Sequence, residues 1–80
     1  MAAYGFTLYF EHEILRKRPY LTREMCIRVV EQPLKVEKQP DGRIRFWGIL
    51  DQLGGRALRV VTLPDGRTIH NAFINRGFRP

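Results

Sequence analysis

The sequence predicts an α+β protein in which a strand and two helices precede an antiparallel sheet of about four strands. Three observations support this fold class. Apolar residues recur with helical spacing in the first half of the chain, they alternate with polar residues in the second half, and two Pro-Asp-Gly-Arg segments divide that second half into hairpins. The helices need an apolar surface to cover, and one face of the sheet provides it, so we expect two layers.

The length and composition are those of one folded domain. The chain has 80 residues, of which 44% are hydrophobic and 28% are charged. This length is sufficient for one hydrophobic core and too short for a second. We therefore expect residues 1–80 to form a single domain.

The N-terminal segment alternates apolar and small or polar residues over positions 4–10. This period of two predicts a strand in which four apolar side chains share one face. These residues are Tyr4, Phe6, Leu8 and Phe10.

The spacing then becomes helical. Phe10 and Ile14 lie on one side of the expected first helix, and His12 and Arg16 project together from roughly the opposite side. Pro19 ends this helix near residue 18.

A second helix is predicted between Thr22, a favourable N-cap, and Pro33. Its apolar stripe predicts a buried face, formed by Met25, Cys26, Val29 and Val30. Because only a short link joins the two helices, they are expected to form a helical hairpin.

Four strands are expected in the second half, at 34–38, 43–50, 56–63 and 67–74. The two Pro-Asp-Gly-Arg segments, at 40–43 and 64–67, have the composition of tight turns. If each is a type I turn with a bulge at its glycine, the register of both hairpins follows. The expected pairs are Val36 with Phe46, Glu37 with Arg45, Val60 with His70, and Arg59 with Asn71.

The charge predicts an anionic partner. Lysine and arginine total 14 against 8 acidic residues, which gives a net charge of +6, and 11 of the 14 are arginine. Guanidinium groups bind phosphate bidentately and stack on bases, so this bias favours a nucleic acid such as RNA.

Other function classes receive little support. The single cysteine, Cys26, cannot form an internal disulfide, and no apolar run is long enough to span a membrane, so we expect a cytoplasmic protein without a membrane partner. Carboxylates, histidines and Cys26 do not cluster with metal-ligand spacing. No glycine-rich phosphate loop is present. We expect neither a metal nor a cofactor.

The order of elements and several local motifs resemble a family of small bacterial domains related to the BrnT toxins and, more distantly, to the RelE and ParE group. The residues that carry this resemblance are 12–16 (His-Glu-Ile-Leu-Arg), 31–33 (Glu-Gln-Pro), 40–45 (Pro-Asp-Gly-Arg-Ile-Arg), 58–61 (Leu-Arg-Val-Val) and 69–73 (Ile-His-Asn-Ala-Phe). Almost the whole chain is covered, although each motif by itself is common.

The resemblance implies a toxin that cleaves mRNA and is held inactive by an acidic antitoxin protein. His12 and Arg16 match the helical His and Arg of the domain family, and Arg45 and Arg59 match its basic strand positions. The ParE branch acts on gyrase and cuts no RNA, so the resemblance in fold does not determine the activity.

Cleavage by an internal 2′-hydroxyl needs groups that move two protons and cations that stabilise the charge on phosphorus. The candidate catalytic residues are the two histidines, His12 and His70, together with Arg59. The candidate nucleic-acid-binding residues are Arg16, Arg43, Arg45, Trp47 and Arg76, where Trp47 would stack a base. Arg79 could add a phosphate contact.

Two other functions fit the same residues. The basic surface could belong to a binding module that takes RNA, DNA or an acidic protein without catalysis, and His12 and His70 would then be ordinary structural residues. It could also be a protein-interaction surface that meets an acidic partner and no nucleic acid.

Overall fold

The structure is a computed structural model that describes residues 4–78. Its five strands are β1 (Gly5–Phe6), β2 (Lys35–Lys38), β3 (Ile44–Leu50), β4 (Arg56–Thr62) and β5 (Thr68–Ile74). Its helical elements are η1 (Phe10–Ile14), α1 (Leu15–Lys17), α2 (Arg23–Glu31) and η2 (Asp51–Leu53). The predicted α+β class, with two helices before an antiparallel sheet, is confirmed.

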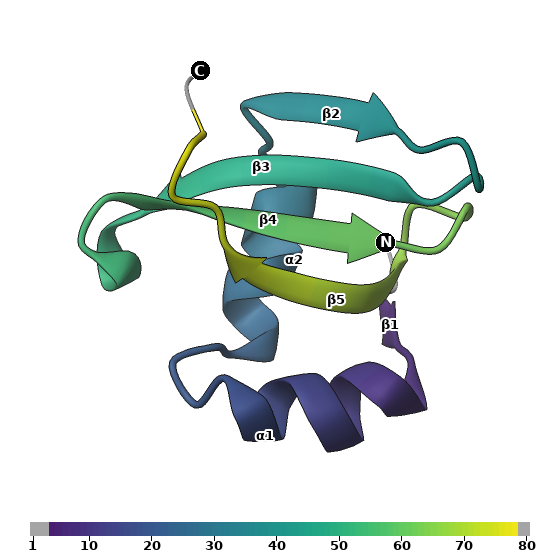
Figure 1. The fold of residues 1–80 in the computed structure, drawn as a ribbon, viewed down its shortest axis with the longest axis horizontal. Helices are drawn as coiled ribbons and strands as arrows, with labels where there is room; N and C mark the ends of the chain where they lie inside the picture. The colour runs from purple at the N-terminus through teal and green to yellow at the C-terminus, as the bar shows by residue number, and fades with distance from the viewer. Residues whose placement is uncertain (1–3, 79–80) are drawn as a thin grey trace.

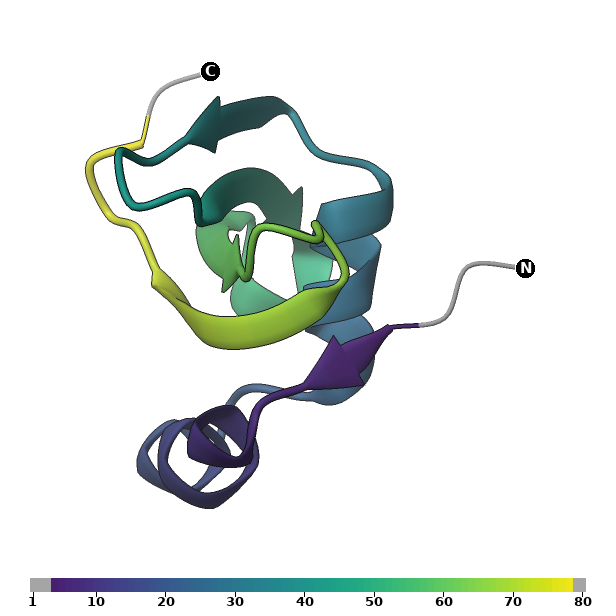
Figure 2. The ribbon, with the colours of Figure 1, turned by 90° about the vertical axis from the view of Figure 1, so that its right-hand side faces the viewer.

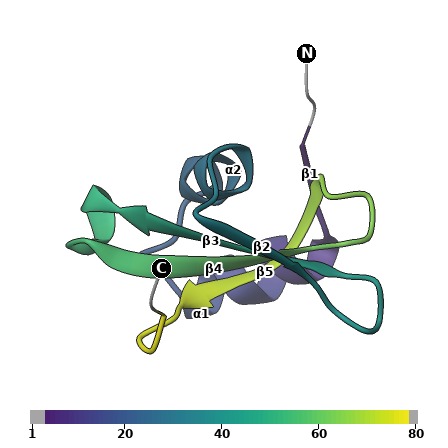
Figure 3. The same cartoon turned by 90° about the horizontal axis from the view of Figure 1, so that it is seen from above.

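The strands form one sheet in the order β1-β5-β4-β3-β2. Neighbours from β2 to β5 are antiparallel, as expected, whereas β1 pairs with β5 in parallel and makes the sheet mixed. Helix α2 lies on one face of the sheet, against β3 and β4 (Figures 1 and 3). We call this the inner face, and the opposite one the outer face.

The expected strand over residues 4–10 is wrong beyond Phe6. The Thr7 hydroxyl accepts a hydrogen bond from the Phe10 N–H at 3.1 Å, and the Thr7 carbonyl accepts one from the Glu11 N–H. Thr7 therefore acts as a helix cap and turns the chain into a helix at Leu8, whose side chain is 73% exposed. The alternation of apolar residues over positions 4–10 indicated a continuous strand, so Thr7 was not recognised as a helix cap.

The first helix contains a wide turn. Residues Phe10–Ile14 are π-helical, and the Leu15 N–H donates to the Phe10 carbonyl before the last turn, α1, becomes α-helical. Phe10 and Ile14 point into the core, as the helical spacing predicts. The helix ends at Lys17, just before Pro19.

The predicted α2 is confirmed. The Thr22 hydroxyl caps it by accepting from the Met25 N–H at 3.1 Å, and Met25, Cys26 and Val29 are buried. The helical hairpin is not found, because the first helix runs beside the β5 edge while α2 crosses the inner face in another direction (Figures 1 and 2).

The core lies between α2, the first helix and the inner face. Its sheet residues are Phe46 and Leu50 of β3, Leu58 and Val60 of β4, and Ile69 and Ala72 of β5. Val29 packs directly onto β3, where a Cβ placed on Gly48 would lie 3.1 Å from a Val29 methyl carbon. The absence of a side chain at Gly48 thus sets how closely α2 approaches the sheet.

The first hairpin has the expected register, with Val36 opposite Phe46 and Glu37 opposite Arg45. The second does not, because Val60 pairs with Ala72 and Arg59 with Phe73.

The two turns differ although their sequences are the same. The first closes between Gln39 and Arg43. In the second, the Asp65 carboxylate accepts from the N–H groups of Arg67 and Thr68 and from the Thr68 hydroxyl, and the loop closes one residue later, between Leu63 and Thr68. These three hydrogen bonds lower the pKa of Asp65, so the carboxylate that shapes the loop stays charged. This longer loop shifts the register by one residue, and a β-bulge opposite Val61 and Thr62 shifts it by a second, so that Val60 pairs with Ala72 and not with His70.

No helix among residues 4–78 is both long and apolar enough to cross a membrane.

We predict that Gly48→Ala destabilises the protein by about 1–3 kcal/mol, because the added methyl group meets Val29 in a packed core. Chemical denaturation followed by circular dichroism measures the change. Gly77→Ala is the control, since a Cβ there meets no atom within 4 Å. Equal stabilities of the two variants would show that α2 can move away from β3 at no cost.

Candidate functional site

The outer face carries a polar cavity of about 320 Å³ at the β4–β5 side of the sheet. Residues of β3 and β4 alternate between this face and the core, and β5 contributes His70, Asn71 and Phe73 to the cavity. The lining residues are Tyr9, Gln39, Arg43, Arg45, Arg59, Val61, His70, Asn71 and Phe73. Three of them are arginines, and none is acidic.

Arg59 lies in the middle of this cluster. Its guanidinium carbon is 4.2 Å from the centre of the Phe73 ring, and its Nε is buried without a hydrogen-bond partner among the described residues. Burial lowers the pKa of Arg59, and the nearby Arg45 charge lowers it further, but the group remains charged at neutral pH. A desolvated cation with an unused N–H favours an anion as its partner.

The other two arginines have acidic neighbours outside the cavity. Arg45 Nη1 donates to Glu37 Oε1 at 2.9 Å, which orients the guanidinium and leaves further N–H donors for a ligand. Arg43 makes a longer ion pair with Asp41, at 3.9 Å, and both side chains are exposed. Such a pair contributes little to stability and is easily exchanged for another anion.

His70 reaches the cavity because of the bulge in β5. Ile69 and Ala72 both point inward, so the extra residue leaves His70 and Asn71 together on the outer face. The register expected from the sequence would have paired His70 with Val60, a core residue. His70 nevertheless lines the same cavity as Arg59 and Asn71.

Two residues of the first helix orient the His70 ring. Its Nδ1 lies 3.1 Å from the Thr7 hydroxyl, and its ring centre lies 5.1 Å from that of Tyr9. Burial lowers the pKa of His70, and the Arg43 charge adds to this effect. The imidazole is therefore mainly neutral at pH 7, and Nδ1 is the ring nitrogen that contacts Thr7.

Several residues expected at the site lie elsewhere. His12 and Arg16 are on the exposed side of the first helix, outside the cavity lining, and Arg16 forms an ion pair with Glu13. Arg76 borders a separate, smaller hollow near Ile49 and Arg56. Arg79 lies outside the described residues.

Trp47 is on the outer face, as predicted, but only 5% of it is exposed. Phe78 stacks on the ring at a centroid distance of 5.8 Å, and Lys35 Nζ lies 5.3 Å from the ring centre. The indole N–H donates to the Asn75 side-chain oxygen at 3.0 Å. The Trp47 ring is therefore buried by contacts within the protein, and we do not assign it a base-stacking role.

Sequence reasoning did not single out Thr7, Tyr9, Arg18 or Phe73. The Arg59 guanidinium lies over the Phe73 ring, and the Arg18 guanidinium carbon lies 5.9 Å from the centre of the same ring. Tyr9 was not a candidate because aromatic residues more often belong to the core than to a site. The capping geometry of Thr7 was the signal that would have moved Tyr9 to the start of a helix.

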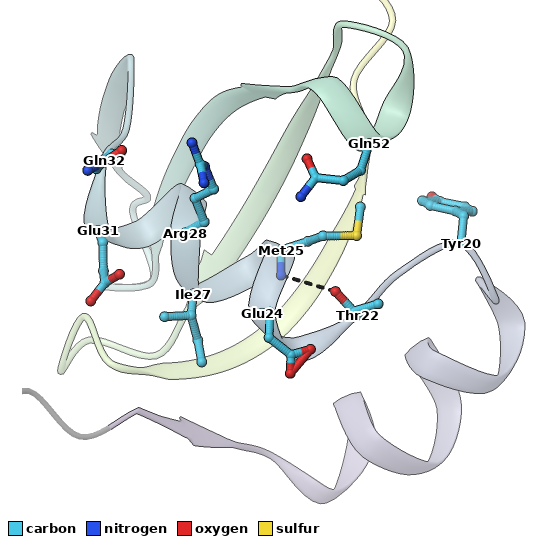
Figure 4. Close-up of a pocket in the computed structure, with 9 residues that line it drawn as sticks. All are labelled: Tyr20, Thr22, Glu24, Met25, Ile27, Arg28, Glu31, Gln32 and Gln52. Carbon is cyan, nitrogen blue, oxygen red and sulfur yellow. Dashed lines mark hydrogen bonds between the residues drawn. The ribbon is translucent and has the colours of Figure 1, made fainter.

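A larger, open cleft of about 730 Å³ lies along α2 on the other side of the sheet (Figure 4). Glu24 and Glu31 project from α2 here, together with Arg28, and Tyr20 and Gln52 flank the cleft at its far end. This mixture of charges does not favour phosphate, so the outer-face cavity is the better candidate site. Among residues 4–78, no group of three or more His, Cys, Asp or Glu side chains is placed to hold a metal ion.

Comparison with known proteins adds no relative. No family model matches the chain, and neither a curated protein nor a solved structure matches it.

The lowered pKa of His70 predicts how stability depends on pH. Below its ordinary pKa of about 6.5, the unfolded chain binds a proton at His70 that the folded protein resists, so stability falls as the pH falls through this range. We expect the melting temperature of His70→Gln to change less than that of the wild type over this interval. His12→Gln is the control, and a wild-type pH profile in the His70 variant would refute this assignment.

Proposed function

We propose that the protein binds RNA, with a backbone phosphate in the outer-face cavity. The convergence of Arg43, Arg45 and Arg59 on a cavity whose described lining contains no acid carries this proposal. Guanidinium forks match the geometry of phosphate oxygens, and the net charge of +6 attracts a polyanion over a longer range.

Two uncharged groups beside the arginines favour RNA over DNA. The Asn71 side-chain oxygen accepts a hydrogen bond from the Ala72 N–H at 2.8 Å. The two N–H donors of the Asn71 side chain can then bind a ligand. Asn71 and His70 both line the cavity and can hydrogen-bond a ribose 2′-hydroxyl. This hydroxyl distinguishes RNA from DNA at a given site.

Cleavage of the bound RNA is a second candidate function, favoured by the neutral His70 beside three cations. His70 Nε2 would take the proton of the 2′-hydroxyl as its oxygen attacks the adjacent phosphorus. The bond from phosphorus to the 5′-oxygen breaks, water supplies the proton to that oxygen, and the arginines stabilise the charge on phosphorus. Thr7 would hold the imidazole through Nδ1.

The biological setting follows from the same proposal. A buried, free Cys26 thiol is compatible with the reducing cytoplasm, where RNA targets are abundant. A toxin role with an acidic antitoxin would add a protein partner that competes with RNA for the basic outer face. The mRNA-cleaving toxins that the sequence resembles would then share this activity.

We predict that Arg45→Ala and Arg59→Lys weaken binding to a single-stranded RNA by roughly tenfold, because each loses fork contacts to phosphate. Arg45→Ala also lowers the slope of log Kd against log salt by about one. Fluorescence anisotropy over a salt series measures both quantities. Arg28→Ala, which removes the same charge on the α2 side, is the matched control. Equal losses in Arg45→Ala and Arg28→Ala, with Arg59→Lys unchanged, would reduce the effect to net charge and contradict a phosphate pocket.

We predict that His70→Ala slows RNA cleavage in chelator by about 10²–10⁴-fold, as expected when a general base is lost. Gel analysis of an end-labelled RNA measures the rate. His12→Ala is the matched control and should cleave at the wild-type rate, because His12 lies outside the cavity lining. RNA binding without fragments from the wild type would exclude the catalytic function and retain the binding function.

A further inference from the structure

Aromatic rings at the outer face decide whether a bound RNA can stack its bases. Stacking needs a ring with one face open to a ligand. Trp47 has no such face, since Phe78 stacks on it, Lys35 lies over it and the residue is 5% exposed. It belongs to the folded sheet.

Phe73 borders the cavity, but its ring is already in use. The Arg59 guanidinium carbon lies 4.2 Å from the ring centre, and that of Arg18 lies 5.9 Å from it. These cation–π contacts hold a cation of the phosphate pocket in place. A base could stack on Phe73 only by displacing the group that binds the phosphate.

Tyr9 differs from both rings. It lines the cavity and is 44% exposed, and one side of its ring leans on His70 at a centroid distance of 5.1 Å and an interplanar angle of 32°. The Thr7 cap fixes the backbone at the start of the helix that carries Tyr9. The contact between Thr7 and His70 fixes the imidazole against which Tyr9 packs. An exposed, positioned ring therefore stands beside three phosphate-binding arginines.

We propose that Tyr9 stacks one base of the bound RNA, while Arg43, Arg45 and Arg59 hold the adjoining phosphate. The site then takes a single stacked nucleotide, and the rest of the strand is held through its backbone. This inference rests on the proposed RNA binding and identifies the residue that recognises a base. It gives little sequence preference, because every base presents a π-face.

The test compares a short single-stranded RNA with an abasic oligomer of the same length and charge. Wild type should bind the RNA about fivefold or more tightly than the abasic oligomer, the lower end of the range for one stacked base. Tyr9→Leu should lose this difference by weakening RNA binding alone. Tyr9→Phe keeps the ring and should retain the wild-type affinity for both.

Tyr20→Leu is the matched control, since Tyr20 is 39% exposed and borders the cleft on the α2 side. Its affinities for both oligomers should equal those of the wild type, and melting curves confirm that each variant folds. Equal wild-type affinities for RNA and abasic oligomer would overturn base stacking while leaving phosphate binding intact. An equal loss on both oligomers in Tyr9→Leu would make Tyr9 a structural residue and overturn its proposed role. Wild type that binds neither oligomer would overturn the proposed function together with this inference.

Discussion

Helix α2 covers one face of the sheet, and the outer face has to be stabilised without a second helical layer. The close contact between Val29 and Gly48 sets how closely α2 approaches the inner face. Side chains of the outer face therefore cover one another. Phe78 and Lys35 cover Trp47, Arg59 covers Phe73, and Glu37 engages Arg45.

This solution explains why the outer face is both ordered and basic. Long arginine side chains cover apolar rings with their stems and guanidinium planes while keeping charged edges toward solvent. An apolar alternative would leave a large exposed apolar patch, which is an aggregation liability. The same side chains that complete the fold thus create a cationic surface, so that stability and the proposed binding share residues.

Much of the fold could be predicted from the sequence because it depends on local signals. The Thr22 cap and the spacing of Met25, Cys26 and Val29 specify α2, and the three-residue turn after Gln39 specifies the first hairpin. The second hairpin has the same four turn residues, but the residue that follows them differs. Thr68 gives Asp65 a hydroxyl donor, where the first hairpin has Ile44.

The candidate site was only partly predictable, because it depends on a bulge and on a helix start. The bulge brings His70 to the outer face, and Thr7 turns Tyr9 toward it. Neither feature can be recognised from the apolar pattern. Over residues 4–10, for example, the same alternation is compatible with a continuous strand and with a strand followed by a helix. Trp47 failed as a binding candidate because burial depends on Phe78, a residue far away in sequence.

Arg59 shows where folding and function conflict. A buried N–H without a partner costs about 1–3 kcal/mol, a sizeable part of the roughly 5–15 kcal/mol that stabilises a small domain. A long apolar side chain at this position could cover Phe73 without leaving a buried donor unused. Burial lowers the pKa of Arg59, and repulsion from the neighbouring Arg45 lowers it further. A bound phosphate relieves the repulsion and uses the free donors of the cluster, so the costs in the unbound protein become a preference for an anion.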